Sequence, residues 1–228
     1  MRGRGAARLG SAKGRRIAST RWLTRHLGDP YVQRAQKEGY RSRAAYKLLE
    51  IDEKYRLLRP GRRVFDLGSA PGGWLQVATR RGARVVGVDL AEVEPVGDAV
   101  TLQGDIFDEA TAERMVAASG GRAEVLLSDV AAPATGRRGV DRLRAEAIGE
   151  AVLALLPRLL APGGSLVLKL LRGADTAITG EVRRRFAAAR LVRPRATHRE
   201  SSEIYLVATG YRPPAGAADE GGDPAPDG

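Results

Sequence analysis

The stretch Val64-Phe65-Asp66-Leu67-Gly68-Ser69-Ala70-Pro71-Gly72-Gly73-Trp74 decides the fold of this chain. Its apolar beginning predicts a buried parallel strand, because helices cover both faces of such a strand. The glycines predict a tight turn, and Leu75-Gln76-Val77-Ala78 indicates the start of a helix. Open α/β sheets hold nucleotide-like ligands with this unit, at the carboxyl ends of their strands.

The spacing of the glycines in this turn narrows the kind of ligand. A dinucleotide fingerprint requires G-x-G-x-x-G, but Ala70 stands where the second glycine should be, and the pattern is G-x-x-x-G-G. A carboxylate such as Asp66 next to the turn would repel a pyrophosphate. The same carboxylate suits a ligand with a cationic centre and an α-amino group. The turn therefore favours S-adenosylmethionine and disfavours a nicotinamide-dependent oxidoreductase.

Acidic residues recur at the ends of the predicted strands. The strand Arg84-Val85-Val86-Gly87-Val88 runs into Asp89, 21 positions after Gly68. An acid at an offset of about 20 reaches ribose hydroxyls in folds of this kind. Predicted strands at 99–102 and 124–129 bring Asp105 and Asp129 to the same edge. One such acid could be a helix cap, but three in successive units predict a ligand site.

The alternation of strands and helices predicts a Rossmann-like, doubly wound, mostly parallel sheet with helices on both faces. Helices are expected at 30–59, 111–119, 142–160 and 176–189, and later strands at 165–170, 191–197 and 203–209. Residues 1–18 predict a disordered basic arm, with an organellar transit peptide as the alternative. Residues 213–228 predict a disordered acidic tail rich in proline and glycine, so that the folded domain is 19–212.

The composition limits the class of protein. The chain has 228 residues, with 38 basic against 27 acidic side chains and a net charge of +11. This charge favours a polyanionic partner such as nucleic acid, unless it only reflects an arginine-rich proteome. Because the chain has no cysteine and two histidines, we expect neither disulfides nor a metal site. Without a membrane span or a secretory signal, we expect a soluble, cytoplasmic protein.

Lysine is rare among the basic residues: five of the 38 are lysines and the other 33 are arginines. Unlike a guanidinium, a lysine amine can lose its proton inside a protein. Lys169 lies in the apolar run 166–171, where it either reaches solvent at a strand end or acts as a general base. Arg41, Arg43 and Lys47 lie in the predicted helical segment, and with the basic arm they are expected to contact RNA phosphates.

Taken together, these motifs resemble the FtsJ-type (RlmE-like) family of ribosomal RNA large-subunit 2′-O-ribose methyltransferases. The resemblance spans about residues 19–212. It is carried by the Val64–Trp74 stretch together with Ser19-Thr20-Arg21-Trp22-Leu23, Arg41-Ser42-Arg43-Ala44-Ala45-Tyr46-Lys47-Leu48, Gln103-Gly104-Asp105, Ser128-Asp129, Leu160-Ala161-Pro162-Gly163-Gly164-Ser165 with Lys169, and Ser202–Gly210. One departure is the loop Val130-Ala131-Ala132-Pro133, where the family often has Met-Ala-Pro-Asn.

The resemblance implies a set of site residues. The family's Lys-Asp-Lys-Glu tetrad implies four catalytic residues: Lys47, Asp129, Lys169 and Glu203. The family's cofactor contacts would fall on Gly72, Trp74, Asp89, Asp105 and Asp129.

The resemblance also implies an activity: S-adenosylmethionine-dependent methylation of the 2′-oxygen of a uridine in 23S ribosomal RNA. The expected partner is ribosomal RNA, within the large ribosomal subunit, and the expected enzyme is a cytoplasmic monomer. One alternative is a transfer-RNA ribose methyltransferase of the same superfamily. A second is a non-catalytic RNA-binding ribosome assembly factor, which would not need Lys169 or Glu203.

Overall fold

The computed structural model describes residues 28–173 and 175–214. The predicted basic arm and the start of the predicted domain at Ser19 lie outside these ranges. Of the predicted acidic tail, all but Pro213 and Pro214 lies outside them too. No helix in the described part of the chain is long and apolar enough to cross a membrane.

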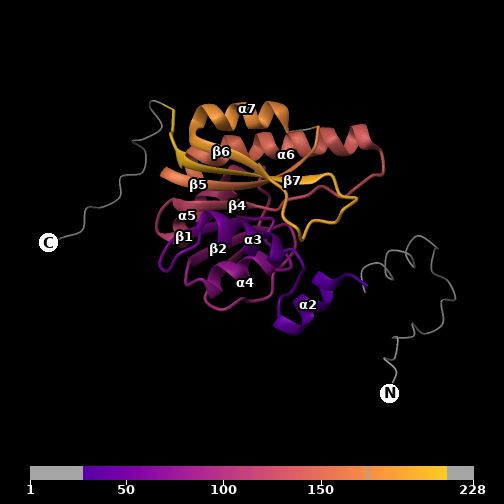
Figure 1. Cartoon of the computed structure of the whole chain (residues 1–228). Coiled ribbons are helices and arrows are strands. Elements are labelled where there is room, and N and C mark those ends of the chain that lie inside the picture. Colours follow the sequence, from indigo (N-terminus) through magenta and orange to yellow (C-terminus); the bar gives the residue numbers. More distant parts are fainter. Residues whose placement is uncertain (1–27, 174, 215–228) are drawn as a thin grey trace, which may run out of the picture.

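The centre of the molecule is one seven-stranded sheet, which confirms the predicted fold class (Figure 1). Its strands follow the spatial order β3-β2-β1-β4-β5-β7-β6. The first five in the chain run parallel, while β7 pairs antiparallel with both β5 and β6. The strands are β1 (Arg63–Leu67), β2 (Arg84–Asp89), β3 (Val100–Gln103), β4 (Ala123–Ser128), β5 (Leu160–Leu171), β6 (Phe186–Val192) and β7 (Glu203–Tyr211).

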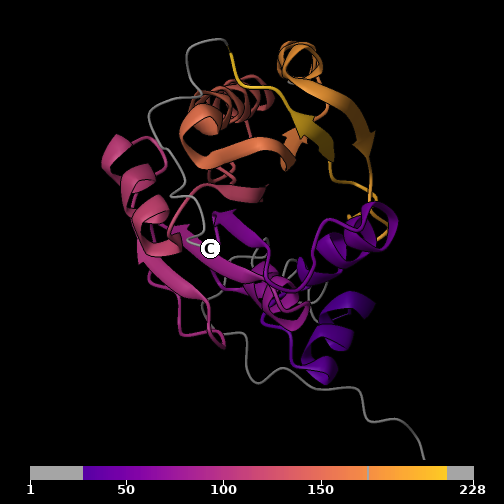
Figure 2. The same ribbon diagram turned by 90° about the vertical axis from the view of Figure 1, so that its left-hand side faces the viewer.

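Helices cover both faces of the sheet, as Figure 2 shows in a view nearly along the strands. The helices are α2 (Pro30–Glu38), α3 (Ala45–Tyr55), α4 (Gly73–Arg80), α5 (Glu109–Ser119), α6 (Arg138–Leu159) and α7 (Thr176–Arg185). One apolar core lies between the sheet and α5, α6 and α7. A second lies between the opposite face and α3 and α4, and α2 packs on the outer side of α3.

The alternation of side chains along two adjacent strands decides where the polar residues of the site lie. In β5, Leu168 faces the α6 side of the sheet, whereas Val167 faces α3 and α4. Because successive side chains point to opposite faces, Lys169 shares the α3 side with Val167. Lys169 is paired in register with Tyr205 of β7, which belongs to the same core as α3. The sheet thus presents both side chains to the helix that carries Lys47.

Three predicted elements are wrong in detail. The expected helix at 30–59 is two helices, because the chain breaks at Gly39, which adopts a left-handed conformation with φ 72°. The expected helix at 176–189 ends at Arg185, and β6 begins at Phe186 rather than at residue 191. The alanines after Phe186 favour a helix only weakly, whereas pairing with β7 and the contact of the Phe186 and Tyr211 rings, 5.1 Å apart, favour a strand. The other predicted helices and strands overlap the observed ones.

Candidate active site

The glycine-rich turn after β1 is held closely against the chain that follows β4. Gly68 adopts φ 76°, and a Cβ on it would lie 3.0 Å or less from backbone atoms of Val130. A larger residue would therefore push these two loops apart. Asp89 at the end of β2 fixes the turn from the other side, because its carboxylate accepts hydrogen bonds from the backbone of Ala70 (3.0 Å) and of Ala91 (2.9 Å).

A cavity of about 710 Å³ opens at the carboxyl ends of β1, β2 and β4. Its lining includes all three of the predicted strand-end acids, Asp89, Asp105 and Asp129. Two large apolar side chains, Leu90 and Phe107, also line it although they are 68% and 60% exposed. Acids on one side and exposed apolar side chains on another suit a ligand with hydroxyls, a cationic group and a flat ring.

A buried acid next to this cavity lacks a partner. Asp66, in the middle of β1, is 1% exposed, and neither of its carboxylate oxygens accepts a hydrogen bond within the described residues. Burial, followed by the charges of Asp129 and Asp89, raises the pKa of Asp66 well above its ordinary value. Because a raised pKa favours the protonated carboxyl of Asp66, the negative charge that a cationic ligand would relieve comes from Asp129 and Asp89.

This environment gives a prediction for Asp66→Asn. A carboxyl whose pKa is raised by folding stabilises the fold at low pH, and this contribution is lost as pH rises from 3.8 through the raised pKa. Asparagine does not titrate. The melting temperature of the ligand-free variant, relative to that of the ligand-free wild type, should therefore increase as pH rises. Differential scanning calorimetry between pH 4 and pH 8 measures the gap. A difference in melting temperature that does not change with pH would contradict the raised pKa of Asp66.

Lys169, on the α3 side of the sheet, contacts Asp129, which lines the cavity, and the Lys169 side chain is 9% exposed. Its Nζ donates to the backbone carbonyl of Asp129 at 2.5 Å and lies 3.2 Å from Oδ1 of the same residue. Both oxygens near Nζ thus belong to Asp129: the backbone carbonyl accepts a hydrogen bond, and the carboxylate forms an ion pair.

A second lysine joins the same cluster through a tyrosine. Lys47 Nζ lies 2.9 Å from Glu203 Oε2 and donates to the Tyr205 hydroxyl at 3.0 Å. The Tyr205 hydroxyl in turn donates to Asp129 Oδ1 at 2.7 Å. Burial, then the charges of Asp129 and Glu203, raise the pKa of Tyr205 well above its ordinary value, so the phenol keeps its proton. Hydrogen bonds thus connect the side chains of Glu203, Lys47, Tyr205 and Asp129, and Lys169 joins them through its ion pair with Asp129.

The structure brings together Lys47, Asp129, Lys169 and Glu203, which the sequence placed in one site only by resemblance. Tyr205 was missed, because an aromatic residue within an apolar strand reads as core. The signal that could have identified Tyr205 is its pairing with Lys169. Both residues lie in strands that were predicted, but the pairing of these strands was not.

Two predicted cofactor residues are not among the residues that line the cavity. The Trp74 side chain is 3% exposed, and its Nε1 donates to the Ala44 carbonyl at 2.8 Å, so this ring holds α4 against α3. Gly72 is the N-cap of α4, with φ 109°, and a Cβ there would lie 2.8 Å from Nη1 of Arg41. Their role toward a cofactor stays a prediction. Leu90 and Phe107 were not predicted, although Leu90 directly follows Asp89 and Phe107 lies two residues after Asp105.

Two arginines that were expected to face RNA are occupied within the fold. Arg41 donates to the carbonyls of Pro71 (3.1 Å), Glu94 (2.7 Å) and Pro95 (2.8 Å). Arg43 donates to the Ala196 carbonyl and forms an ion pair of 2.6 Å with Asp29. These guanidinium groups hold loops together, and Nε and Nη1 of Arg43 are buried, so neither arginine offers phosphates a free guanidinium.

A family model matches most of this sequence. The model of FtsJ-like methyltransferases matches residues 40–211, which include every residue of the site. A curated relative named ribosomal RNA large subunit methyltransferase E, from Acidiphilium cryptum (strain JF-5), is 47% identical over 216 residues and aligns over 94% of this chain and 96% of its own. A protein of the same name from Granulibacter bethesdensis is 46% identical over 207 residues, with 90% of each chain covered.

A solved structure shares the fold. The crystal structure of a ribosomal RNA methyltransferase from Plasmodium falciparum superposes with a TM-score of 0.66 at 26% sequence identity. The match covers 75% of this chain and 98% of the Plasmodium chain.

Proposed function

The chain belongs to the FtsJ-like methyltransferase family, and from this premise we propose that it methylates the 2′-oxygen of a uridine ribose in large-subunit (23S) ribosomal RNA. The observation that carries the proposal is the contact of Lys169 Nζ with the carbonyl and the carboxylate of Asp129, a residue that lines the cavity together with Asp89 and Asp105. The names of the relatives from Acidiphilium and Granulibacter support large-subunit ribosomal RNA as the substrate.

The residues around the cavity fit S-adenosylmethionine. Asp89 would hold the ribose hydroxyls, and Leu90 and Phe107 would contact the adenine. Asp66, which has no hydrogen-bond partner within the described residues, lies near Asp129 and Asp89 where a cationic group would be stabilised. When bound, S-adenosylmethionine supplies an electrophilic methyl carbon for in-line transfer to the ribose 2′-oxygen.

Lys169 is the proposed general base. A ribose 2′-hydroxyl is a weak nucleophile at neutral pH and must lose its proton as it attacks. In this proposal the neutral amine of Lys169 receives the proton on its lone pair, while Asp129 holds Nζ through the hydrogen bond to its carbonyl and through its carboxylate at 3.2 Å. Asp129 also stabilises the ammonium that forms, because its carboxylate remains 3.2 Å from Nζ.

The remaining cluster residues position Asp129. Glu203 balances the charge of Lys47. Lys47 donates to the hydroxyl of Tyr205 and so directs the O–H of Tyr205 toward Asp129. Without that hydrogen bond, the carboxylate could rotate and carry Lys169 with it. Tyr205 is therefore a positioning residue in this proposal.

Tyr205→Phe tests this role. The variant keeps the ring, which packs 5.9 Å from Trp74, but loses the hydroxyl that joins Lys47 to Asp129. Hydrogen bonds to charged groups contribute about 1.5–3 kcal/mol, so we expect kcat to fall on the order of 10- to 100-fold. The RNA KM and the affinity for S-adenosylmethionine should change little. A raised KM with an unchanged kcat would assign Tyr205 to RNA binding instead.

The substrate itself is tested by mapping ribose methylation. Mass spectrometry of ribosomal and transfer RNA from cells with and without the gene should show one ribose methyl group missing from 23S ribosomal RNA. Radiolabel transfer from S-adenosylmethionine to the same RNA by the purified protein should restore it. A missing methyl group in transfer RNA would support the superfamily alternative, and no transfer to any RNA would support a non-catalytic assembly factor.

A further inference from the structure

We infer that the segment 193–202, between β6 and β7, forms a phosphate-binding groove for the RNA strand that carries the target ribose. The inference rests on the proposed function and assigns part of the RNA surface to particular residues. Figure 1 shows this segment on the same edge of the molecule as the carboxyl ends of the parallel strands. It lines an open groove of about 770 Å³ together with Arg172, which follows β5.

The segment has no helix or strand, yet it is closely held. One guanidinium, that of Arg193, donates to four backbone carbonyls of the segment and its end: those of His198, Arg199, Ser201 and Glu203. The carboxylate of Glu50 in α3 accepts the backbone N–H groups of Arg195 (2.6 Å) and Ala196 (3.0 Å). The groove is therefore preorganised, and its shape does not have to be created by the ligand.

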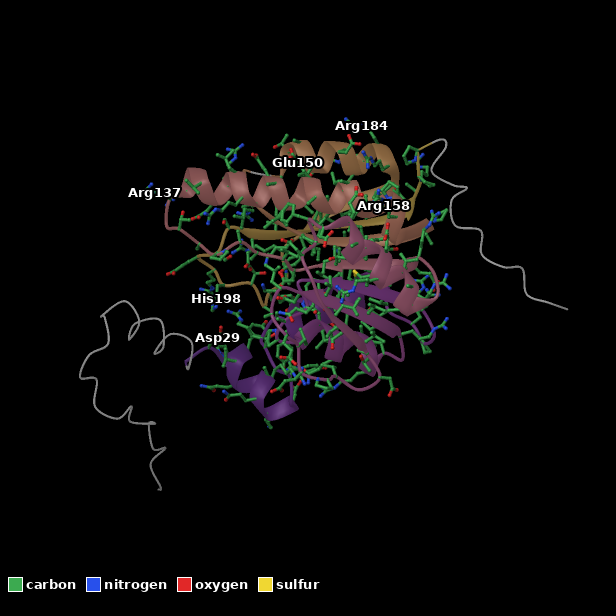
Figure 3. All side chains as sticks on the ribbon, turned by 180° about the vertical axis from the view of Figure 1, so that it is seen from behind. Asp29, Arg137, Glu150, Arg158, Arg184 and His198 are labelled. Atoms are coloured by element: carbon green, nitrogen blue, oxygen red, sulfur yellow. The ribbon has the colours of Figure 1, made fainter. Side chains whose placement is uncertain are left out.

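The segment is also anchored to the start of α2. Ala196 is fully buried among Ala35 and Tyr46, and its carbonyl accepts a hydrogen bond from Arg43. His198 Nε2 lies 3.4 Å from Asp29, and Figure 3 shows both labels on one edge of the molecule. Asp29 thus joins the segment to the N-terminus of α2.

Three arginines of the groove remain available. Arg172, Arg195 and Arg199 are exposed, and their side chains form no hydrogen bond or ion pair with another described residue. With Arg193, the groove has four arginines against one acid, Glu200. Arginine binds phosphate with paired N–H groups. The phosphodiester backbone of an RNA strand is therefore the ligand that this charge fits.

The groove leads to the reaction centre. Segment 193–202 runs directly into Glu203, whose carboxylate pairs with Lys47. Arg172 is three residues beyond Lys169, or about 10 Å at roughly 3.3 Å per residue of strand. Its backbone N–H donates to the Ser202 carbonyl at 2.9 Å, which closes the groove at this end. A strand with its ribose at Lys169 would therefore place the neighbouring phosphates within reach of these arginines.

The test is the triple variant Arg172→Ala, Arg195→Ala, Arg199→Ala. The matched control is the triple variant Arg59→Ala, Arg122→Ala, Arg183→Ala, which removes the same charge. These three side chains also form no hydrogen bond or ion pair with another described residue, and they lie at or near the opposite ends of the strands. Binding of a single-stranded RNA oligonucleotide and of 23S ribosomal RNA is measured against salt concentration. Each phosphate contact on a single strand contributes about 0.7 to the slope of log K against log salt.

The groove variant should flatten this slope by about 2 and bind RNA at least 10-fold more weakly at low salt, since three contacts are removed. In methyl transfer its KM for RNA should rise while kcat at saturating RNA is retained, and its affinity for S-adenosylmethionine should match the wild type. The control variant should keep the wild-type slope. Equal slopes for the groove and control variants would overturn the inference.

These outcomes separate the two proposals. If the wild type transfers no methyl group but the groove variant still flattens the salt slope, the groove stands and the proposed function fails. If the wild type methylates RNA and the groove variant has the wild-type KM and slope, the proposed function stands and the groove is wrong.

Discussion

Lys169→Arg is expected to reduce methyl transfer by at least about 10²- to 10⁴-fold while the fold and cofactor binding are preserved. The substitution keeps the positive charge, so a lysine that acts only by its charge would survive it with a modest loss. A general base would not, because arginine cannot give up its proton at working pH. A larger side chain fits this position in β5 poorly, since the side chain of Lys169 is 9% exposed and its Nζ contacts both the carbonyl and the carboxylate of Asp129.

Arginine is also larger than lysine, and misplacement alone can cost on the order of 10²-fold. Lys169→Met therefore accompanies it, because methionine is smaller and carries neither charge nor proton. Single-turnover transfer of radiolabelled methyl to 23S ribosomal RNA measures the rate, and calorimetry checks the affinity for S-adenosylmethionine. Near-normal transfer by the arginine variant would falsify the base assignment and leave Lys169 as a positioning charge.

A matched control is available within the same chain. Lys54 lies near the end of α3, is exposed, and has its Nζ 5.4 Å from the ring centroid of Tyr55. Lys54→Arg makes the same chemical change outside the site and should leave transfer unaffected. If both arginine variants lose activity equally, the loss comes from a general effect of the substitution on the protein and not from the site.

Asp89→Ala is expected to weaken binding of S-adenosylmethionine by about 10²-fold or more. The expected hydrogen bonds to the ribose hydroxyls are each worth about 1.5–3 kcal/mol. The structure adds a second cause, because Asp89 also fixes the glycine-rich turn through Ala70 and Ala91. The variant should therefore lose thermal stability as well as affinity, and RNA binding should change least.

The stability loss needs its own control. Asp52 is 4% exposed, accepts the backbone N–H of Leu58 at 2.8 Å and pairs with Arg81 at 3.1 Å. It is not among the residues that line the cavity, so Asp52→Ala should lower the melting temperature without changing cofactor affinity. Titration calorimetry at a temperature where both variants are folded makes the comparison. Wild-type affinity in Asp89→Ala would remove Asp89 from the cofactor site.

Local sequence patterns determined most of the fold and half of the site. The strand, glycine turn and helix of residues 64–78 could be read directly, because backbone geometry there follows from neighbouring residues. The strand-end rule then placed Asp89, Asp105 and Asp129 at one cavity without any knowledge of their distances. Lys169 was marked by the scarcity of lysine in this chain and by its apolar neighbours.

The partners of the charged side chains were decided only by the tertiary structure. The positive charges of Arg41 and Arg43 suggested an RNA surface, but carbonyls and an acid far away in the chain occupy both. Arg172, Arg195 and Arg199 looked no different in the sequence. Which arginines stay available depends on long-range packing, which local charge patterns do not encode.

The same holds for the hydrogen-bonded chain at the centre of the site. Lys47, Asp129 and Tyr205 meet because β7 lies next to β5 in antiparallel register and because α3 covers the face to which Tyr205 points. A shift of one residue in that register would turn Tyr205 and Glu203 to the opposite face. Strand pairing between distant segments therefore assembled the cluster, whereas the sequence by itself determined only which strands were there to be paired.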